Sequence, residues 1–499
     1  MICTDAYFNH DWLVEISTPL LMSKAPSMSL VNNTRWVAVS QAAKISAQVI
    51  SLVLLARIIP PAEYGLLAMA TVIVNFGYLF RDFGTAAALI QRPVITEALK
   101  NAVFTFNLLM GAAVAILIIL LSPLIAHYFG QPRLTPVLCL LALTFPLASS
   151  ASSHLALLER DSKFKKIAGI EASSSLIATV VGVMAALAGW GVYSLAAQAL
   201  CNALLSTVQI WLASAWRPSW RKARDVGSIG EIFSFSGNLA AFNFIIYLAR
   251  NTDTWIISYY MSSALLGAYN LATRIMMLPM QTLTFVVGRS LLPVLSRDHQ
   301  DSAKVTTTFL AATAGIAFLA FPLMTGIMVL REPFVTVVFG PQWGLTAELL
   351  LWLAPAGMLQ AINSTSSTVF IAKGETRLLF WMGVLNATLM IMAFLAGTLN
   401  GITELVRYYL VANLAYVSIC TCVVFNCMKS SPLMMIKNLL PSIIGCLLMA
   451  LAMTQFAHFL PQQTTLLSLL LHTAFGSVVY LLVMALLSPA TLKRFARFA

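Results

Sequence analysis

The chain has 499 residues, of which 59% are hydrophobic and only 10% are charged, whereas about 25% of the residues of a typical soluble domain are charged. A soluble fold cannot hide that much apolar surface, so the bilayer must act as its solvent. The formal net charge of +12 does not indicate nucleic acid binding, because the basic residues recur singly or in small groups between apolar runs. The composition therefore predicts an all-α protein that crosses a membrane many times.

About fourteen segments are long and apolar enough to cross, since a spanning helix needs about 20 mainly apolar residues. Residues 1–35 contain Asp5, Asp11 and Glu15, which interrupt any apolar core and predict a cytosolic tail instead of a signal peptide. The predicted spans are 36–58, 65–90, 102–128, 134–157, 167–188 and 190–215, then 231–260, 264–295, 305–330, 345–371, 378–399, 404–427, 436–459 and 464–488.

A basic linker at 216–229 lies midway through the first twelve spans. Transporters are commonly built from internal repeats, so this position predicts two six-helix lobes, 36–215 and 230–427. A helix pair at 428–488 and a basic cytosolic tail at 489–499 complete the predicted organisation.

The basic residues of the loops alternate between the two sides of the membrane. With the N-terminus inside, the outside loops keep only Arg133 and Arg331, while groups such as Lys163, Lys165 and Lys166 fall inside. Cytoplasmic loops carry an excess of Lys and Arg. The bias supports the number of spans and predicts that both termini are cytosolic.

Seven basic residues fall within the predicted spans. A charge at the centre of a helix costs about 2.5–3.5 kcal/mol on insertion scales, so such residues usually face a protein interior or a wet cavity. Arg57 and Arg407 lie at the ends of their spans, where a long side chain is expected to reach the interface. Arg289 is expected either to reach the cytosolic interface or to face a cavity. The others are expected to face a cavity or to form structural ion pairs: Lys44, Arg81, Arg250 and Arg274.

Polar residues three or four positions apart share one face of a helix, and four spans contain such a stripe. Two stripes in each predicted lobe indicate a hydrated cavity between the lobes. The stripes are Gln41, Lys44, Gln48 and Ser51; Asn75, Tyr78 and Asp82, with Arg81 about 100° away; Asn243, Tyr247, Arg250 and Thr254, with Asp253 at the edge; and Asn270, Arg274, Gln281 and Thr284 around Met277.

Basic residues outnumber the acids Asp82, Glu171 and Asp253 within the spans, which favours an anionic cargo. The fork of guanidinium donors matches a pyrophosphate or an acidic sugar. The predicted substrate-binding residues are Lys44, Arg81, Arg250 and Arg274 for anionic groups, and Asn75, Asn243, Asn270 and Gln281 for hydroxyls.

Catalytic motifs are missing from the sequence. It contains no phosphate-binding G-x-x-x-x-G-K-[ST] loop and no H-E-x-x-H motif, and its cysteines form no metal-binding pattern. The sequence therefore predicts no catalytic residue, metal or cofactor. An enzyme such as a polysaccharide polymerase is disfavoured, because the predicted connections are too short to hold a catalytic loop.

Short segments along residues 36–375 resemble, in order, bacterial polysaccharide (oligosaccharide) flippases of the multidrug/oligosaccharidyl-lipid/polysaccharide exporter superfamily. The similarity is particular to exporters of exopolysaccharide repeat units of the colanic-acid or xanthan kind. The segments are Leu55-Ala56-Arg57-Ile58-Ile59, Glu63-Tyr64-Gly65-Leu66-Leu67, Asp82-Phe83-Gly84, Ile90-Gln91-Arg92, 157–167, Tyr269-Asn270-Leu271-Ala272, Leu292-Pro293-Val294-Leu295 and Val338-Phe339-Gly340-Pro341-Gln342-Trp343.

The resemblance implies two six-helix lobes in a V plus two C-terminal helices, in the bacterial inner membrane. It implies export of undecaprenyl-pyrophosphate-linked oligosaccharide by alternating access, next to a polysaccharide polymerase and export machinery. An ion gradient would drive transport, with Asp82 or Asp253 as the proton or sodium site. The alternatives are a multidrug or metabolite antiporter of the same superfamily and a flippase of lipid-linked peptidoglycan precursors.

Overall fold

The computed structural model describes residues 45–81, 89, 95–219, 247, 251–297, 301–459 and 465–488, without the side chains of Arg81 and 278–290. Within these ranges all regular elements are helices, and eleven of them are long and apolar enough to cross a membrane. The prediction of an all-α protein with many spans is confirmed.

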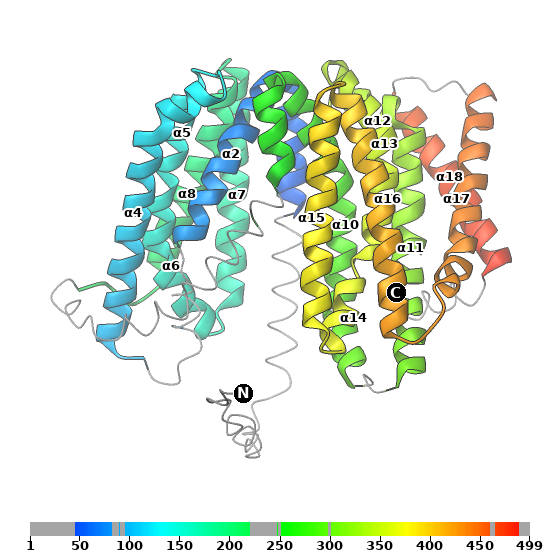
Figure 1. Cartoon of the computed structure of the whole chain (residues 1–499). Coiled ribbons are helices and arrows are strands. Elements are labelled where there is room, and N and C mark those ends of the chain that lie inside the picture. Colours follow the sequence, from blue (N-terminus) through cyan, green and yellow to red (C-terminus); the bar gives the residue numbers. More distant parts are fainter. Residues whose placement is uncertain are drawn as a thin grey trace, which may run out of the picture.

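Two groups of helices diverge from a common end (Figure 1). The first, here called the N-lobe, contains Ile45–Ile58, α2 (Pro61–Arg81), α4 (Glu97–Tyr128), α5 (Leu134–Ala142), α6 (Thr144–Arg160), α7 (Phe164–Leu187) and α8 (Val192–Ala213). The second, the C-lobe, contains the helical residues 251–260, α10 (Ser263–Arg297), α11 (Ser302–Val329), α12 (Arg331–Val338), η5 (Pro341–Trp343), α13 (Gly344–Asn363), α14 (Ser366–Ala372), α15 (Thr376–Thr398) and α16 (Ile402–Cys427).

A last pair of helices, α17 (Leu433–Phe459) and α18 (Leu466–Leu487), packs against α11 on the outer side of the C-lobe. These helices point large apolar side chains outward, as Leu447, Leu467 and Leu486 show with exposed fractions of 60%, 68% and 83%. In water such a surface would be unfavourable by about 25 cal/mol per Å². The pair therefore belongs in lipid.

The lobes touch at the end where α2 and α10 begin, here called the closed end. At the crossing of these helices, a Cβ atom on Gly65 would overlap the carbonyl of Ser263, and one on Gly267 would overlap the carbonyl of Pro61. Only glycine permits so close an approach of two backbones. The opposite end, here called the basic end, carries the α6–α7 and α14–α15 connections with their lysines.

Two prolines explain a second contact at the closed end. Pro60 and Pro61 have no N–H, so the carbonyls of Ala56 and Arg57 lack their helical partners. Donors from the C-lobe replace them. The indole Nε1 of Trp343 donates to the Ala56 carbonyl at 2.8 Å, and the amide of Gln342 donates to both carbonyls at 2.8 and 3.2 Å.

Hydrogen bonds also run from the N-lobe to the C-lobe, because Arg57 donates to the last two carbonyls of α12. Its Nε lies 2.9 Å from the Val338 carbonyl, and its Nη2 bonds the Val337 carbonyl. The exposed side chain caps a helix of the other lobe, and the expectation that it reaches the membrane interface stays a prediction.

Candidate transport cavity

A cavity of about 1020 Å³ lies within the N-lobe and reaches α10 of the C-lobe. It extends from Leu55 and Tyr64 near the closed end to Glu159 and Ile167 at the basic ends of α6 and α7. Sites for small molecules usually measure about 300–1,000 Å³. The volume therefore suits a ligand larger than a typical metabolite.

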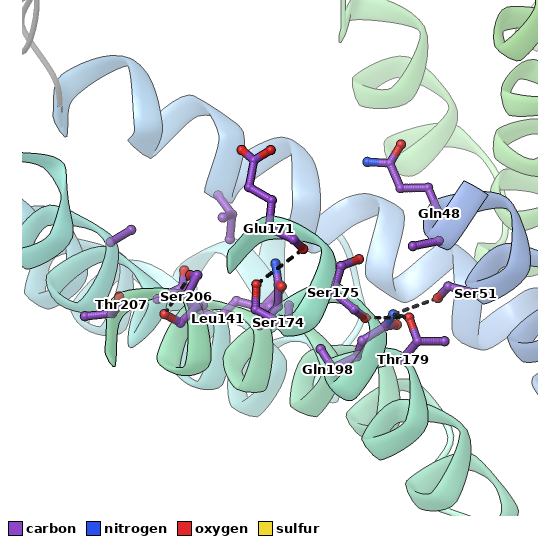
Figure 2. A pocket seen from close by; sticks show the side chains of 18 of the residues that line it. Gln48, Ser51, Leu141, Glu171, Ser174, Ser175, Thr179, Gln198, Ser206 and Thr207 are labelled. Atoms are coloured by element: carbon purple, nitrogen blue, oxygen red, sulfur yellow. Dashed lines mark hydrogen bonds between the residues drawn. The ribbon is translucent and has the colours of Figure 1, made fainter. Parts of the chain in front are cut away.

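Hydroxyl and amide side chains dominate the polar part of the lining. They come from the first helix, α2, α6, α7 and α8, and Figure 2 shows several of them around the hollow. The residues are Gln48, Ser51, Thr71, Thr144, Ser152, Ser174, Ser175, Thr179, Gln198, Asn202, Ser206 and Thr207.

Gln198 joins three helices along this wall. Its amide nitrogen donates to the hydroxyl of Ser51 at 2.7 Å and to that of Thr179 at 3.3 Å (Figure 2). Its chain also fills the space above Gly182, where a Cβ would come within 2.9 Å of it. These contacts fix the distance between α7, α8 and the first helix.

Other amides of the lining remain available to a ligand. The side chains of Gln48 and Asn202 are exposed to the cavity and make no hydrogen bond within the described residues. An amide offers two donors and one acceptor. These two residues therefore present hydrogen-bonding groups that the protein itself does not use.

Three charged residues line the described part of the cavity. Arg274 lies three turns into α10, about 16 Å from its start at 1.5 Å per residue, and its exposed side chain interacts electrostatically with Tyr64. Within the described residues Arg274 forms no salt bridge. Glu159 and Glu171 lie nearer the basic end and interact with each other.

Only one of the predicted substrate-binding residues is seen in the lining. Arg274 faces the cavity, whereas Asn75 is exposed elsewhere and Asn270 is half-buried outside it. The roles of all eight stay predictions. The structure does not describe the side chains of Lys44, Arg81, Asn243, Arg250 and Gln281.

The stripes predicted from the sequence agree with the lining more closely than the charges do. Gln48 and Ser51 of the first stripe, Tyr78 of the second and Met277 of the fourth all face the cavity. Described members of three stripes thus line one cavity, but this cavity lies within the N-lobe, whereas the stripes predicted a cavity between the lobes.

The polar lining from α7 and α8 was not predicted, although the spacing of its residues indicates it. Gln198, Asn202 and Ser206 are four residues apart, which places them on one helix face. They carry no charge, so a search for charged residues within the spans does not find them.

Asp253, a predicted ion-coupling residue, lies outside the cavity lining. Its carboxylate accepts from the Tyr269 hydroxyl at 2.8 Å and from the Thr254 backbone N–H at 2.7 Å. The Tyr409 hydroxyl, which interacts electrostatically with Asp253, accepts from Gln360 at 2.5 Å.

The charges that were predicted to accompany Asp253 are not described. Among the described residues Asp253 forms no salt bridge; its predicted partner, Arg250, and the second predicted coupling residue, Asp82, lie outside them. In the described chain no three metal-ligating side chains gather.

Residues 54–348, more than half of the chain, match the model of a family described as polysaccharide biosynthesis protein. The chain belongs to this family. This polysaccharide biosynthesis protein is 26% identical to the succinoglycan biosynthesis transport protein ExoT of Rhizobium meliloti (strain 1021) over 488 residues, which cover 96% of each chain. It is also 26% identical to the lipopolysaccharide biosynthesis protein WzxC of Escherichia coli (strain K12), over 74% of this chain and 75% of the relative.

Solved structures share the fold of this polysaccharide biosynthesis protein. The lipid II flippase MurJ in an inward closed conformation aligns with a TM-score of 0.72 at 16% identity, over 91% of this chain and 98% of that one. An inward-facing multidrug resistance transporter of the MATE family aligns with a TM-score of 0.55 at 14% identity, over 78% and 96%. These structures confirm the predicted fold class.

Proposed function

We propose that this protein is a flippase, not an enzyme, which moves undecaprenyl-pyrophosphate-linked oligosaccharide repeat units across the bacterial inner membrane for exopolysaccharide synthesis. The observation that carries the proposal is the large cavity within the helices of a membrane protein, lined in part by hydroxyl and amide groups and closed at one end by the other lobe. Burying a hydroxyl without a hydrogen bond costs several kcal/mol. A polar path removes that barrier for sugars.

The direction of transport follows from the loop charges. An excess of Lys and Arg marks the cytosolic side, so the basic end and both termini are cytosolic and the closed end is periplasmic. Cargo enters the cavity from the cytosolic leaflet. Separation of the lobes at the closed end then releases it towards the polysaccharide polymerase and export machinery.

Arg274 supports the assignment of a pyrophosphate cargo, since it is a cation inside the cavity without a salt bridge to any described residue. In this proposal Lys44, Arg81 and Arg250 join it at the anionic group, so that the whole cavity is basic. Asn75, Asn243, Asn270 and Gln281 would contact hydroxyls on the path of the cargo.

Asp253 is proposed as the site of ion coupling, with Asp82 as the alternative. Its carboxylate is held by neutral donors within the C-lobe and lies apart from the cavity. Binding of a proton or sodium ion there would change the charge of the lobe without competing with the cargo. Such differential binding is what shifts a two-state equilibrium.

The test uses a strain that lacks its own repeat-unit flippase. Expression of Arg274→Ala or Arg250→Ala should abolish exopolysaccharide export while the protein still inserts normally. Arg331→Ala, which changes an arginine at the closed end outside the cavity lining, serves as the control. Wild-type export from both cavity variants would remove these residues from the mechanism.

A multidrug or metabolite antiporter is the second candidate, and one observation favours it. The described lining holds two carboxylates, Glu159 and Glu171, against the single arginine Arg274, and carboxylates suit organic cations. Efflux of cationic dyes by vesicles containing the protein, without movement of lipid-linked sugar, would establish this alternative.

A further inference from the structure

The cavity lining is chemically uneven. The α7–α8 wall, which we define as Ser174, Ser175, Thr179, Gln198, Asn202, Ser206 and Thr207, offers only uncharged hydrogen-bonding groups. The guanidinium of Arg274 comes instead from α10 of the other lobe. The N-lobe thus presents neutral groups, with the carboxylates Glu159 and Glu171 nearer the basic end, while the C-lobe presents the cation.

The two surfaces suit different parts of one ligand. The amides of Gln48 and Asn202 can both donate and accept, which matches sugar hydroxyls that do the same. The hydroxyls of the wall that already donate to backbone carbonyls remain as acceptors: Ser174, Thr179, Ser206 and Thr207. A guanidinium only donates, through a planar fork that matches phosphate oxygens. A molecule with a phosphate at one end and sugars at the other would satisfy both surfaces together.

Hydrogen bonds join the helices of the wall to the first helix. The Gln198 amide donates to Ser51 of the first helix and to Thr179 of α7. Beside this bridge, Gln48 and Asn202 extend amides that make no hydrogen bond within the described residues, and Figure 2 shows the Gln48 side chain reaching away from its helix.

We infer that the α7–α8 wall and Gln48 bind the sugar part of the cargo, while Arg274 binds its phosphate. This inference rests on the proposed flippase function. Asn202 and Gln48 then determine which sugars are accepted. A correctly placed sugar hydroxyl forms a hydrogen bond with the amide, whereas a sugar without it leaves the amide unpaired.

The test compares two lipids on the purified full chain in nanodiscs. One is sugar-free undecaprenyl pyrophosphate, and the other carries a neutral glucose–galactose disaccharide on the same pyrophosphate. Asn202→Leu and Gln48→Leu should each weaken binding of the disaccharide-linked lipid about tenfold, as expected for one lost hydrogen bond with an unpaired partner. Both variants should bind the sugar-free lipid within about twofold of wild type.

Arg274→Gln should weaken both lipids, and Asn426→Leu, at an exposed asparagine of α16 outside the cavity lining, should weaken neither. Retained binding of the sugar-free lipid shows that a variant is folded. If both wall variants bind the disaccharide-linked lipid as wild type does, or lose both lipids equally, the sugar-binding wall is refuted. If the wild-type protein binds neither lipid, the proposed function itself fails.

Discussion

The glycine crossing at the closed end gives the most direct test of how the lobes move. In Gly65→Ala the added methyl would occupy the position of the Ser263 carbonyl. That obstacle is backbone and cannot rotate away as a side chain would. Since the crossing joins α2 to α10, the substitution should force the lobes apart at this end.

The size of the effect can be worked from general costs. Overpacking a well-filled contact costs about 1–3 kcal/mol, and about 2 kcal/mol changes an equilibrium about thirtyfold. Alanine also favours a helix over glycine by about 1 kcal/mol, but this term is the same in the closed and open states and cancels. We therefore expect the ratio of closed to open molecules to fall about thirtyfold.

Cross-linking across the closed end measures this ratio. The rings of Tyr128 and Tyr259, one from each lobe, lie 4.9 Å apart, so cysteines at both positions of a cysteine-free background should react with a short bifunctional reagent. Gly65→Ala should lower the cross-linking rate strongly. Gly383→Ala is the matched control, since a Cβ there has no neighbour within 4 Å. Equal rates in folded Gly65→Ala and wild-type protein would refute the reasoning.

Three further substitutions test other contacts. Trp343→Phe removes the donor to Ala56 but keeps an aromatic ring, so it should favour the open state about fivefold in the same cross-linking assay, as a loss of about 1 kcal/mol predicts; an unchanged rate would contradict the capping role. Gln198→Leu removes two hydrogen bonds from the cavity wall and should lower the thermal unfolding midpoint by a few degrees, which a midpoint equal to that of wild type would disprove. Asp253→Asn should abolish the acceleration of transport by a proton or sodium gradient while lipid binding persists, and a gradient response like that of wild type would exclude this carboxylate as the coupling site.

The sequence predicts the described membrane helices well, because hydropathy alone determines which segments enter lipid. The predicted helix boundaries leave out polar residues in the first turn of a helix. The fourth helix, α4, begins at Glu97 instead of 102 because Thr96 caps it, accepting from the Leu99 N–H at 3.2 Å, and because Asn101 bonds the Glu97 carbonyl. A hydropathy profile assigns such polar turns to the loops. The break between α13 and α14 at Ser364 and Thr365 was likewise invisible.

Long-range partners are what the sequence does not show. Arg57 and Arg407 look alike as basic residues near the ends of spans, yet Arg57 caps Val338, which is 281 residues away. Arg407 instead pairs with Glu404 on its own helix and lies 4.8 Å above the ring of Trp352. The three-residue spacing of Glu404 and Arg407 makes their pair predictable from the sequence. The contacts with Val338 and Trp352 are not predictable in this way. Charge within a span therefore predicts that a partner exists without saying which.

The hydrogen bonds at the closed end can be exchanged for bonds to water at low cost. Pro60 and Pro61 leave two carbonyls free at a helix end near the membrane surface, and the C-lobe donors that satisfy them compete with solvent. Each such bond is worth only about 0.5–1.5 kcal/mol net. Apolar packing also crosses this end, since Leu55 and Tyr64 of the N-lobe share one buried cluster with Leu266 and Trp343 of the C-lobe. Separation of the lobes must therefore expose part of this cluster as well as break those bonds, while each lobe keeps its own packing, as rigid-body alternation between an open and a closed state requires.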